Sequence, residues 1–143
     1  MKTFDMQFIR YINLFSKVTG VNPKHCFSYN NTLVFVVQGM SVQRAIGRDN
    51  SNLKKLSEIL GKRIRVLAEP SGIGDLEQFF RVLVSPITFE KLEVIMGESG
   101  KELVISSGGR ESKAMLIGRE RIREKEMKDI LNQYFEIKNV RIM

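Results

Sequence analysis

Two four-residue segments, each beginning with glycine, combine the residue types that suit a phosphate-binding turn. They are Gly-Arg-Asp-Asn at residues 47–50 and Gly-Arg-Glu-Arg at residues 118–121, and each lies between two segments of helical hydrophobic spacing. A glycine lets the chain reverse, and the helix that follows offers unpaired N–H groups and the positive end of its dipole. With a flanking arginine, such a turn can contact the phosphates of a nucleic acid while neighbouring apolar side chains form a floor for bases.

The candidate nucleic-acid contacts are the residues of the two turns and the residues beside them. The first set is Arg44, Ile46, Gly47, Arg48, Asp49, Asn50, Lys54 and Lys55, and the second is Lys113, Gly118, Arg119, Glu120, Arg121 and Arg123. Ile46 is included as a side chain that lines a base groove, although packing in the core explains it at least as well. Around the second turn, Glu111, Glu120, Glu124 and Glu126 offset the positive charge.

An internal repeat gives these glycines more weight than a simple helix cap would have. Residues 45–60 align without gaps on residues 116–131, at an offset of 71 positions. Ile46, Gly47, Arg48, Ile59 and Leu60 recur as Ile117, Gly118, Arg119, Ile130 and Leu131. The turn therefore occurs twice at the same place in a repeated pattern.

The hydrophobic periodicity predicts the order helix, strand, strand, helix, turn, helix, strand in each half. In the first half we expect helices over residues 4–18, 41–46 and 51–60 and strands over 25–29, 32–38 and 63–68. In the second half we expect helices over 75–83, 112–117 and 122–134 and strands over 89–96, 102–106 and 135–142. Asn30 and Asn31 tolerate the positive φ of a tight hairpin. Pro70, Ser71, Gly72 and Gly74 form a linker that divides the chain into residues 1–70 and 71–143.

The stretch GMSVQRAIGRDNSNLKKLSEILGKRIRVLAE resembles the hallmark of KH domains, which is a helix, a G-x-x-G loop, a second helix and a strand. Because a helix and a hairpin precede it, the order resembles the type II arrangement. Two such domains in tandem resemble the archaeal NusA-type transcription factors. The resemblance implies an α+β fold with two tandem type II KH domains, each a small three-stranded sheet covered by helices. It also implies binding of single-stranded RNA and a role in transcription elongation or termination alongside RNA polymerase.

Both loops depart from the G-x-x-G pattern at the second glycine. The first has Asn50 there, which adopts a left-handed conformation at modest cost. The second has Arg121, for which that conformation is less favourable; its charge suits a phosphate, but it equally fits a loop that no longer holds RNA. The first loop is therefore the stronger candidate.

The net positive charge of the chain comes entirely from its first half. Residues 1–70 carry 11 Lys and Arg against 4 Asp and Glu, whereas residues 71–143 carry 12 of each kind. This asymmetry indicates a polyanionic partner that binds mainly to the first half, with a merely solvated surface as the alternative. The alternation over residues 63–67 places Arg63 and Arg65 on one face of a strand, where they extend the basic surface or are simply solvated.

The composition argues against catalysis and against bound cofactors. His25 is the single histidine and Cys26 the single cysteine, so a catalytic triad, a zinc site and an internal disulfide are not expected. Gly108-Gly109 lacks the Lys-Ser/Thr of a nucleotide-binding loop. We therefore expect no enzyme activity, no cofactor and no small-molecule substrate. At the start of a strand, Cys26 and His25 are best explained as a packed thiol and a partly exposed imidazole.

The apolar runs are too short to span a bilayer, and the amino terminus lacks the features of a signal peptide. These observations predict a cytoplasmic protein with no membrane partner. Two alternatives to an RNA-binding transcription factor remain open at this point. One is a ribosomal or ribosome-assembly KH protein, and the other is a protein-interaction module that docks on RNA polymerase with degenerate RNA loops.

Overall fold

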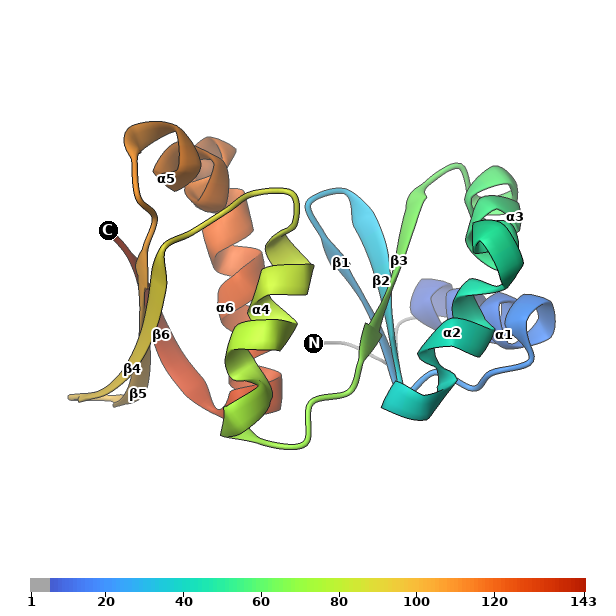
Figure 1. Ribbon diagram of the computed structural model, residues 1–143, viewed down its shortest axis with the longest axis horizontal. Coiled ribbons are helices and arrows are strands. Elements are labelled where there is room, and N and C mark those ends of the chain that lie inside the picture. The colour runs from blue at the N-terminus through green and yellow to red at the C-terminus, as the bar shows by residue number, and fades with distance from the viewer. Residues whose placement is uncertain (1–5) are drawn as a thin grey trace. The chain divides into compact units, whose positions relative to one another are not determined.

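The computed structural model describes residues 6–143, which form two compact units that divide between Glu69 and Pro70 (Figure 1). The first unit contains α1 (Met6–Thr19), β1 (His25–Tyr29), β2 (Thr32–Val37), α2 (Val42–Ile46), α3 (Ser51–Leu60) and β3 (Arg63–Ala68). The second contains α4 (Leu76–Val84), β4 (Lys91–Gly97), β5 (Gly100–Ser106), α5 (Arg110–Ile117), α6 (Ile122–Phe135) and β6 (Ile137–Ile142). Both units have the predicted element order. Residues 4 and 5 of the first predicted helix lie outside the described part of the chain.

The sheet of the first unit has the order β1-β2-β3, with β1 antiparallel and β3 parallel to β2. Its hairpin closes through Asn30 and Asn31, whose φ angles are 51° and 59°. Two consecutive residues with positive φ match the twist of paired strands, which is why an Asn-Asn pair suits this turn. Tyr29 and Thr32 are consequently direct partners across the hairpin. The prediction of a tight hairpin is confirmed.

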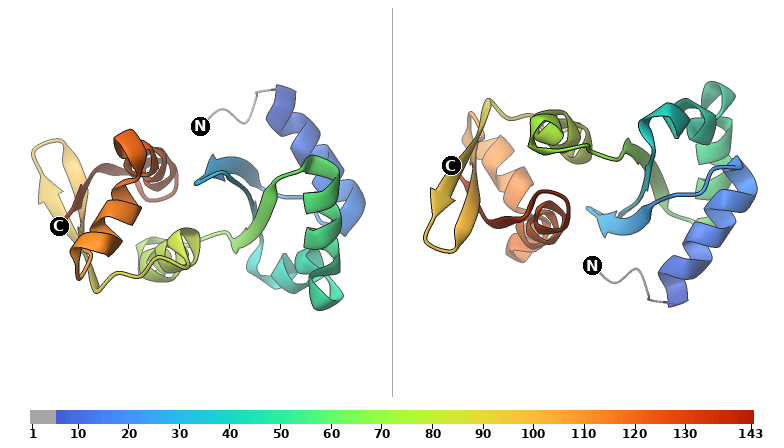
Figure 2. Two further views of the ribbon diagram at one scale, coloured as in Figure 1. Left: turned by 90° about the horizontal axis from the view of Figure 1, so that it is seen from above. Right: turned by 90° about the horizontal axis from the view of Figure 1, so that it is seen from below.

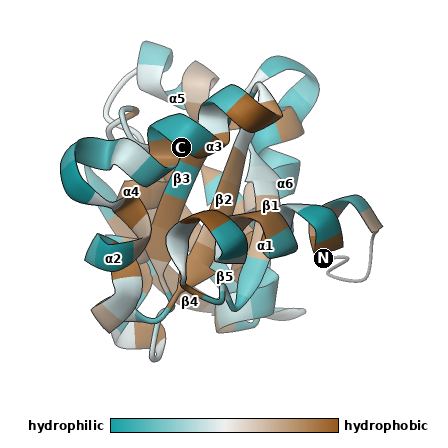
Figure 3. Ribbon diagram, turned by 90° about the vertical axis from the view of Figure 1, so that its right-hand side faces the viewer, coloured by the Kyte–Doolittle hydropathy of each residue, from teal (hydrophilic) through white to brown (hydrophobic). Residues whose placement is uncertain are grey.

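The core of the first unit lies between this sheet and its helices. Phe15 of α1 stacks on Phe35 of β2 at 4.3 Å between ring centroids, and Leu56 of α3 is fully buried in the same cluster. Cys26 is fully buried as well, whereas His25 is partly exposed, as expected. Figure 2 shows α1 and α3 on the same face of the sheet, and Figure 3 shows that β2 is mostly hydrophobic whereas β3 has both hydrophilic and hydrophobic residues. Packing of these helices fixes where the turn after α2 lies.

The second unit repeats this topology, with the sheet order β4-β5-β6 and β6 parallel to β5. Helices α5 and α6 both contact β6, and α4 contacts α6 through Phe79, whose ring lies 5.5 Å from that of Phe135. Both units are thus a three-stranded mixed sheet with helices packed on it. The structure confirms the α+β fold class with two tandem KH-type units.

Two predicted strands begin later than expected. The strand predicted from residue 89 begins at Lys91, because Phe89 instead packs its ring against Phe80 at 5.3 Å. The strand predicted from residue 135 begins at Ile137, because α6 continues to Phe135 and ends at Glu136 with a left-handed φ of 57°. Helix periodicity and strand alternation both fit Phe135, so the sequence does not decide between them.

Within residues 6–143, no helix is long and apolar enough to cross a bilayer. The same residues contain no group of three or more His, Cys, Asp or Glu side chains that could hold a metal ion.

Candidate nucleic-acid interface

The turn after α2 reverses the chain within four residues. Gly47 has φ 81° and ψ 170°, and its N–H donates to the Gln43 carbonyl at 3.0 Å, which ends the helix. Asp49 and Asn50 then both adopt left-handed conformations, with φ 54° and 61°. The Asn50 N–H donates to the Gly47 carbonyl at 3.3 Å, so the turn is closed by its own backbone before α3 begins at Ser51.

The turn after α5 has the same backbone. Gly118 has φ 77° and ψ 171°, Glu120 has φ 55°, and Arg121 has φ 62° and ψ 24°, against 61° and 24° for Asn50. Arg121 therefore takes the left-handed conformation that its side chain disfavours. Any difference between the two loops in binding must come from side chains and charge rather than from backbone shape.

A side chain from the following helix braces each turn. The Asn52 side-chain amide donates to the Arg44 carbonyl at 3.2 Å, and Arg123 Nη1 donates to the Met115 carbonyl at 2.8 Å. Asn52 and Arg123 are equivalent positions of the repeat, and so are Arg44 and Met115. Each bond joins the start of the long helix to the last turn of the short one. The bracing pair holds the two helix ends together across the turn.

Each turn requires glycine at its first position for two reasons. The backbone φ is positive there, and the bracing side chain leaves no room for a Cβ. A Cβ on Gly47 would lie 2.9 Å from the side-chain amide of Asn52. A Cβ on Gly118 would lie 2.8 Å from Cγ and 3.1 Å from the backbone nitrogen of Arg123. The bracing side chain fills the space that any larger residue would need.

The two helices that follow the turns differ in charge at their first turn. The first turn of α3 has no acidic residue, and Asn50 makes no capping bond through its side chain. The first turn of α6 contains Glu124, which is mostly buried and lies 3.7 Å from Arg121 Nη1. A helix N-terminus is a favourable position for a phosphate. A carboxylate there occupies that position, and its negative charge repels a phosphate. The start of α3 is therefore the better anion site.

The structure brings together most of the residues predicted around the first turn. Arg48, Asp49 and Asn50 are exposed on the turn, and Lys54 and Lys55 are exposed on the first half of α3. Ile46 is partly buried against the core of its unit, which favours the packing explanation of its position. Arg44 points elsewhere, since its Nη2 lies 3.4 Å from the place that a Cβ on Gly20 would take, at the end of α1.

Around the second turn, Arg119, Glu120, Arg121 and Lys113 are exposed. Arg123 is partly buried, and one nitrogen of its guanidinium is occupied by the brace. The predicted role of Arg123 as a direct contact therefore competes with a structural role. Sequence inspection did not single out Asn52, although its alignment with Arg123 places two side-chain donors at one position of the repeat.

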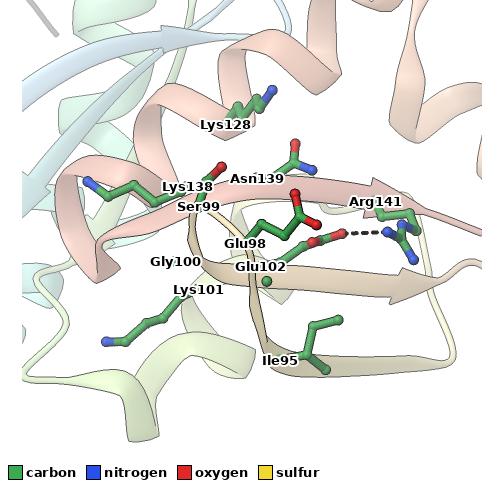
Figure 4. A pocket seen from close by; sticks show the side chains of 11 residues that line it. Ile95, Glu98, Ser99, Gly100, Lys101, Glu102, Lys128, Lys138, Asn139 and Arg141 are labelled. Atoms are coloured by element: carbon green, nitrogen blue, oxygen red, sulfur yellow. Dashed lines mark ion pairs between the residues drawn. The ribbon is translucent and has the colours of Figure 1, made fainter.

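A polar hollow of about 630 Å³ lies in the second unit around the hairpin between β4 and β5 (Figure 4). Lys101, Lys128, Lys138 and Arg141 line it together with Glu98 and Glu102. The buried Glu102 carboxylate is paired with Arg141 at 3.0 Å, so these two charges within the hollow neutralise each other. The four cations outnumber the two carboxylates, so the hollow carries charges of both signs with an excess of positive charge.

No model of a known protein family matches the chain. A curated protein from Methanococcus vannielii, named probable transcription termination protein NusA, is 33% identical over 97 residues, which cover 68% of this chain and 53% of that protein. The chain belongs to the NusA-type family. The crystal structure of APE1850 matches with a TM-score of 0.67 and 32% sequence identity, over 94% of this chain and 96% of that one.

The chain spans about half the length of the curated NusA relative that it matches. Membership in the NusA-type family agrees with the resemblance found in the sequence and with the two KH-type units of the fold. The residues predicted to contact RNA stay a prediction, which is developed below.

Proposed function

We propose that this NusA-type chain binds single-stranded RNA through the turn at Gly47 and acts in transcription termination or elongation alongside RNA polymerase. The observation that carries the proposal is the start of α3. There a braced glycine turn presents exposed Arg48 and Asn50 next to a helix N-terminus that has no carboxylate in its first turn. Lys54 and Lys55 add positive charge on the same helix.

Phosphate groups would approach the N–H groups at the start of α3, with Arg48 as a charge-assisted donor. Bases would then lie toward α2 and the neighbouring edge strand β3, which carries Arg63 and the partly buried Arg65. The turn at Gly118 would contribute less, because Glu124 lies at the equivalent helix start. The name of the curated relative supports a transcriptional role over a ribosomal one.

Filter binding of the whole chain to single-stranded RNA, measured at several salt concentrations, tests the proposal. We expect log affinity to fall linearly with log salt concentration, with a slope of about −0.7 for each phosphate contacted. The double substitution Arg48→Asp/Asn50→Asp should weaken binding at least tenfold at low salt, because aspartate tolerates the turn conformation and changes mainly its charge.

The matched control is the double substitution Arg119→Asp/Arg121→Asp, which changes the equivalent positions of the second turn. It should cost clearly less affinity than the change in the first turn. If the wild-type chain does not bind RNA at low salt, the RNA-binding function is wrong. If it binds and the first double substitution has no effect, the turn at Gly47 is not the contact.

A second candidate function, docking on RNA polymerase, is favoured by the edge strand β4. Val94, Ile95 and Met96 are consecutive on this strand and are 40%, 38% and 77% exposed. Exposed apolar residues on an edge strand are typical of protein-interaction sites. Retention of purified polymerase by the immobilised chain, and its loss on Met96→Lys, would support this function independently of RNA binding.

A further inference from the structure

A smaller hollow in the first unit gathers positive charge away from the Gly47 turn. It has a volume of about 270 Å³ and is lined by Gly20, Val21, Asn22, Lys24, Gln38, Ser41 and Arg44. Its lining residues come from the connection between α1 and β1, from the residue that follows β2, and from Ser41 and Arg44 at and within α2. Every side chain that lines it, apart from that of Val21, is polar or absent.

The hollow contains two cations, Lys24 and Arg44. No acidic residue lines the hollow, and within residues 6–143 neither cation forms an ion pair. Asn22, Gln38 and Ser41 add hydrogen-bond donors to the same surface. The donor set is that of a phosphate site, in contrast to the mixed charges around Glu102.

The second unit provides an internal comparison. The Lys24 N–H donates to the Val36 carbonyl at 2.7 Å, and the Glu90 N–H makes the equivalent bond to Ser106 at 2.8 Å. Each donor directly precedes the first paired residue of its strand, so Glu90 takes the place of Lys24. Met115 takes the place of Arg44 in the repeat. Both cations are therefore specific to the first unit.

The position of Arg44 relative to the turn allows one RNA strand to reach both the Gly47 turn and the hollow. Arg44 precedes Gly47 by three residues, which is about 4.5 Å along a helix axis. Its backbone carbonyl accepts the brace from Asn52, while its guanidinium reaches the end of α1. The turn and the hollow thus lie at the two ends of α2.

We propose that Lys24 and Arg44 form a second phosphate subsite, which binds a backbone phosphate of the same RNA strand that contacts the Gly47 turn. The subsite rests on the proposed RNA-binding function and extends it by one phosphate contact. It assigns Arg44 to this hollow rather than to the turn, and it gives Lys24 a role that its sequence context does not indicate.

The test compares Lys24→Ala/Arg44→Ala with Arg10→Ala/Lys62→Ala in the whole chain, using single-stranded RNA across a salt series. Each double substitution removes two exposed positive charges from the first unit. Arg10 lies ten residues before Gly20, about 15 Å along α1. Lys62 precedes β3, at the end of the sheet opposite Gln38. We expect the hollow variant to bind about five- to tenfold more weakly at low salt, with a slope smaller by about 0.7, and the control to change less than twofold.

Arg44→Lys keeps the charge and should retain most of the affinity, which separates loss of the cation from loss of packing. Circular dichroism of each variant checks that the first unit stays folded. Equal effects of the hollow and control doubles, with wild-type binding intact, would overturn the subsite and leave the proposed function standing. A wild-type chain that does not bind RNA at low salt would overturn both.

Discussion

At the scale of single residues, both turns keep left-handed conformations at positions that are not glycine. Asp49, Asn50, Glu120 and Arg121 all have φ between 54° and 62°. Such a conformation costs roughly 1 kcal/mol for a residue with a Cβ, and least for Asn and Asp. Glu120 and Arg121 are less suited to it than Asp49 and Asn50, so the second turn stores more of this strain.

Replacing Arg121 with glycine should therefore stabilise the protein. We expect Arg121→Gly to raise the free energy of unfolding by about 1 kcal/mol, since relief of strain exceeds the loss of the long, 3.7 Å ion pair between the exposed Arg121 and Glu124. Urea denaturation measures it. Arg121→Ala is the control, because it removes the same charge but keeps the strain. A glycine variant no more stable than the alanine variant would show that the turn is not strained.

The brace leads to a second prediction at this scale. Asn52→Ala removes the bond to the Arg44 carbonyl, which should cost about 1 kcal/mol of stability and weaken RNA binding several-fold by loosening the turn. Asn52→Arg should restore RNA affinity, because Arg123 makes the same bond in the second unit. Asn13→Ala on the exposed side of α1 controls for loss of an amide. Failure of arginine to rescue would leave Asn52 with a purely local packing role.

At the scale of elements, the two helices that follow the turns share a geometry and differ in charge. Leu53 in α3 corresponds to Glu124 in α6, so one helix start is neutral and the other carries a carboxylate. Glu124 stabilises its own helix through the dipole. The same charge disfavours a phosphate at the start of α6. The carboxylate therefore stabilises α6, and its absence leaves the start of α3 as the better anion site.

Removing the carboxylate should change these two properties in opposite directions. Glu124→Gln should tighten RNA binding two- to fivefold at low salt and lower the free energy of unfolding by about 0.5 kcal/mol. Filter binding and urea denaturation measure the two effects. Glu136→Gln changes the net charge equally at the far end of α6, about 20 Å away, and should leave affinity nearly unchanged. Equal tightening by both substitutions would point to net charge alone.

At the scale of the whole molecule, the net charge of +7 resides in the first half of the chain. The second half contains as many acidic as basic residues, and its hollow around Glu102 mixes both signs. Long-range attraction of a polyanion should therefore act mainly on the first unit. The two units share a fold but differ in net charge.

This difference predicts unequal effects from identical charge changes. Lys54→Gln/Lys55→Gln in α3 and Lys125→Gln/Lys128→Gln in α6 each remove two positive charges. We expect the first pair to reduce RNA affinity about tenfold at low salt and the second about twofold, because only the first lies beside the favoured helix start. Titration with single-stranded RNA measures both. Equal losses would mean that overall charge, rather than the first unit, controls binding.

The sequence by itself determined the element order, the hairpin at Asn30-Asn31 and the two glycine turns. These features are local, since periodicity, positive φ and helix ends depend on neighbouring residues. The repeat and the charge asymmetry are equally visible in sequence. The end of α6 at Phe135 was not, because an aromatic residue fits a helix or a strand until packing decides.

Only the tertiary structure decided which side chains meet. It showed that Asn52 and Arg123 reach back to the preceding helix, that Arg44 turns away toward Gly20, and that Lys24 lines the same hollow as Arg44. Lys24 and Arg44 are 20 positions apart, and their proximity depends on how α1, α2 and the sheet pack. Such packing sets the direction of a long side chain. The pattern of glycine followed by arginine therefore locates the turn in the sequence, but it does not identify all the residues that support the turn or bind beside it.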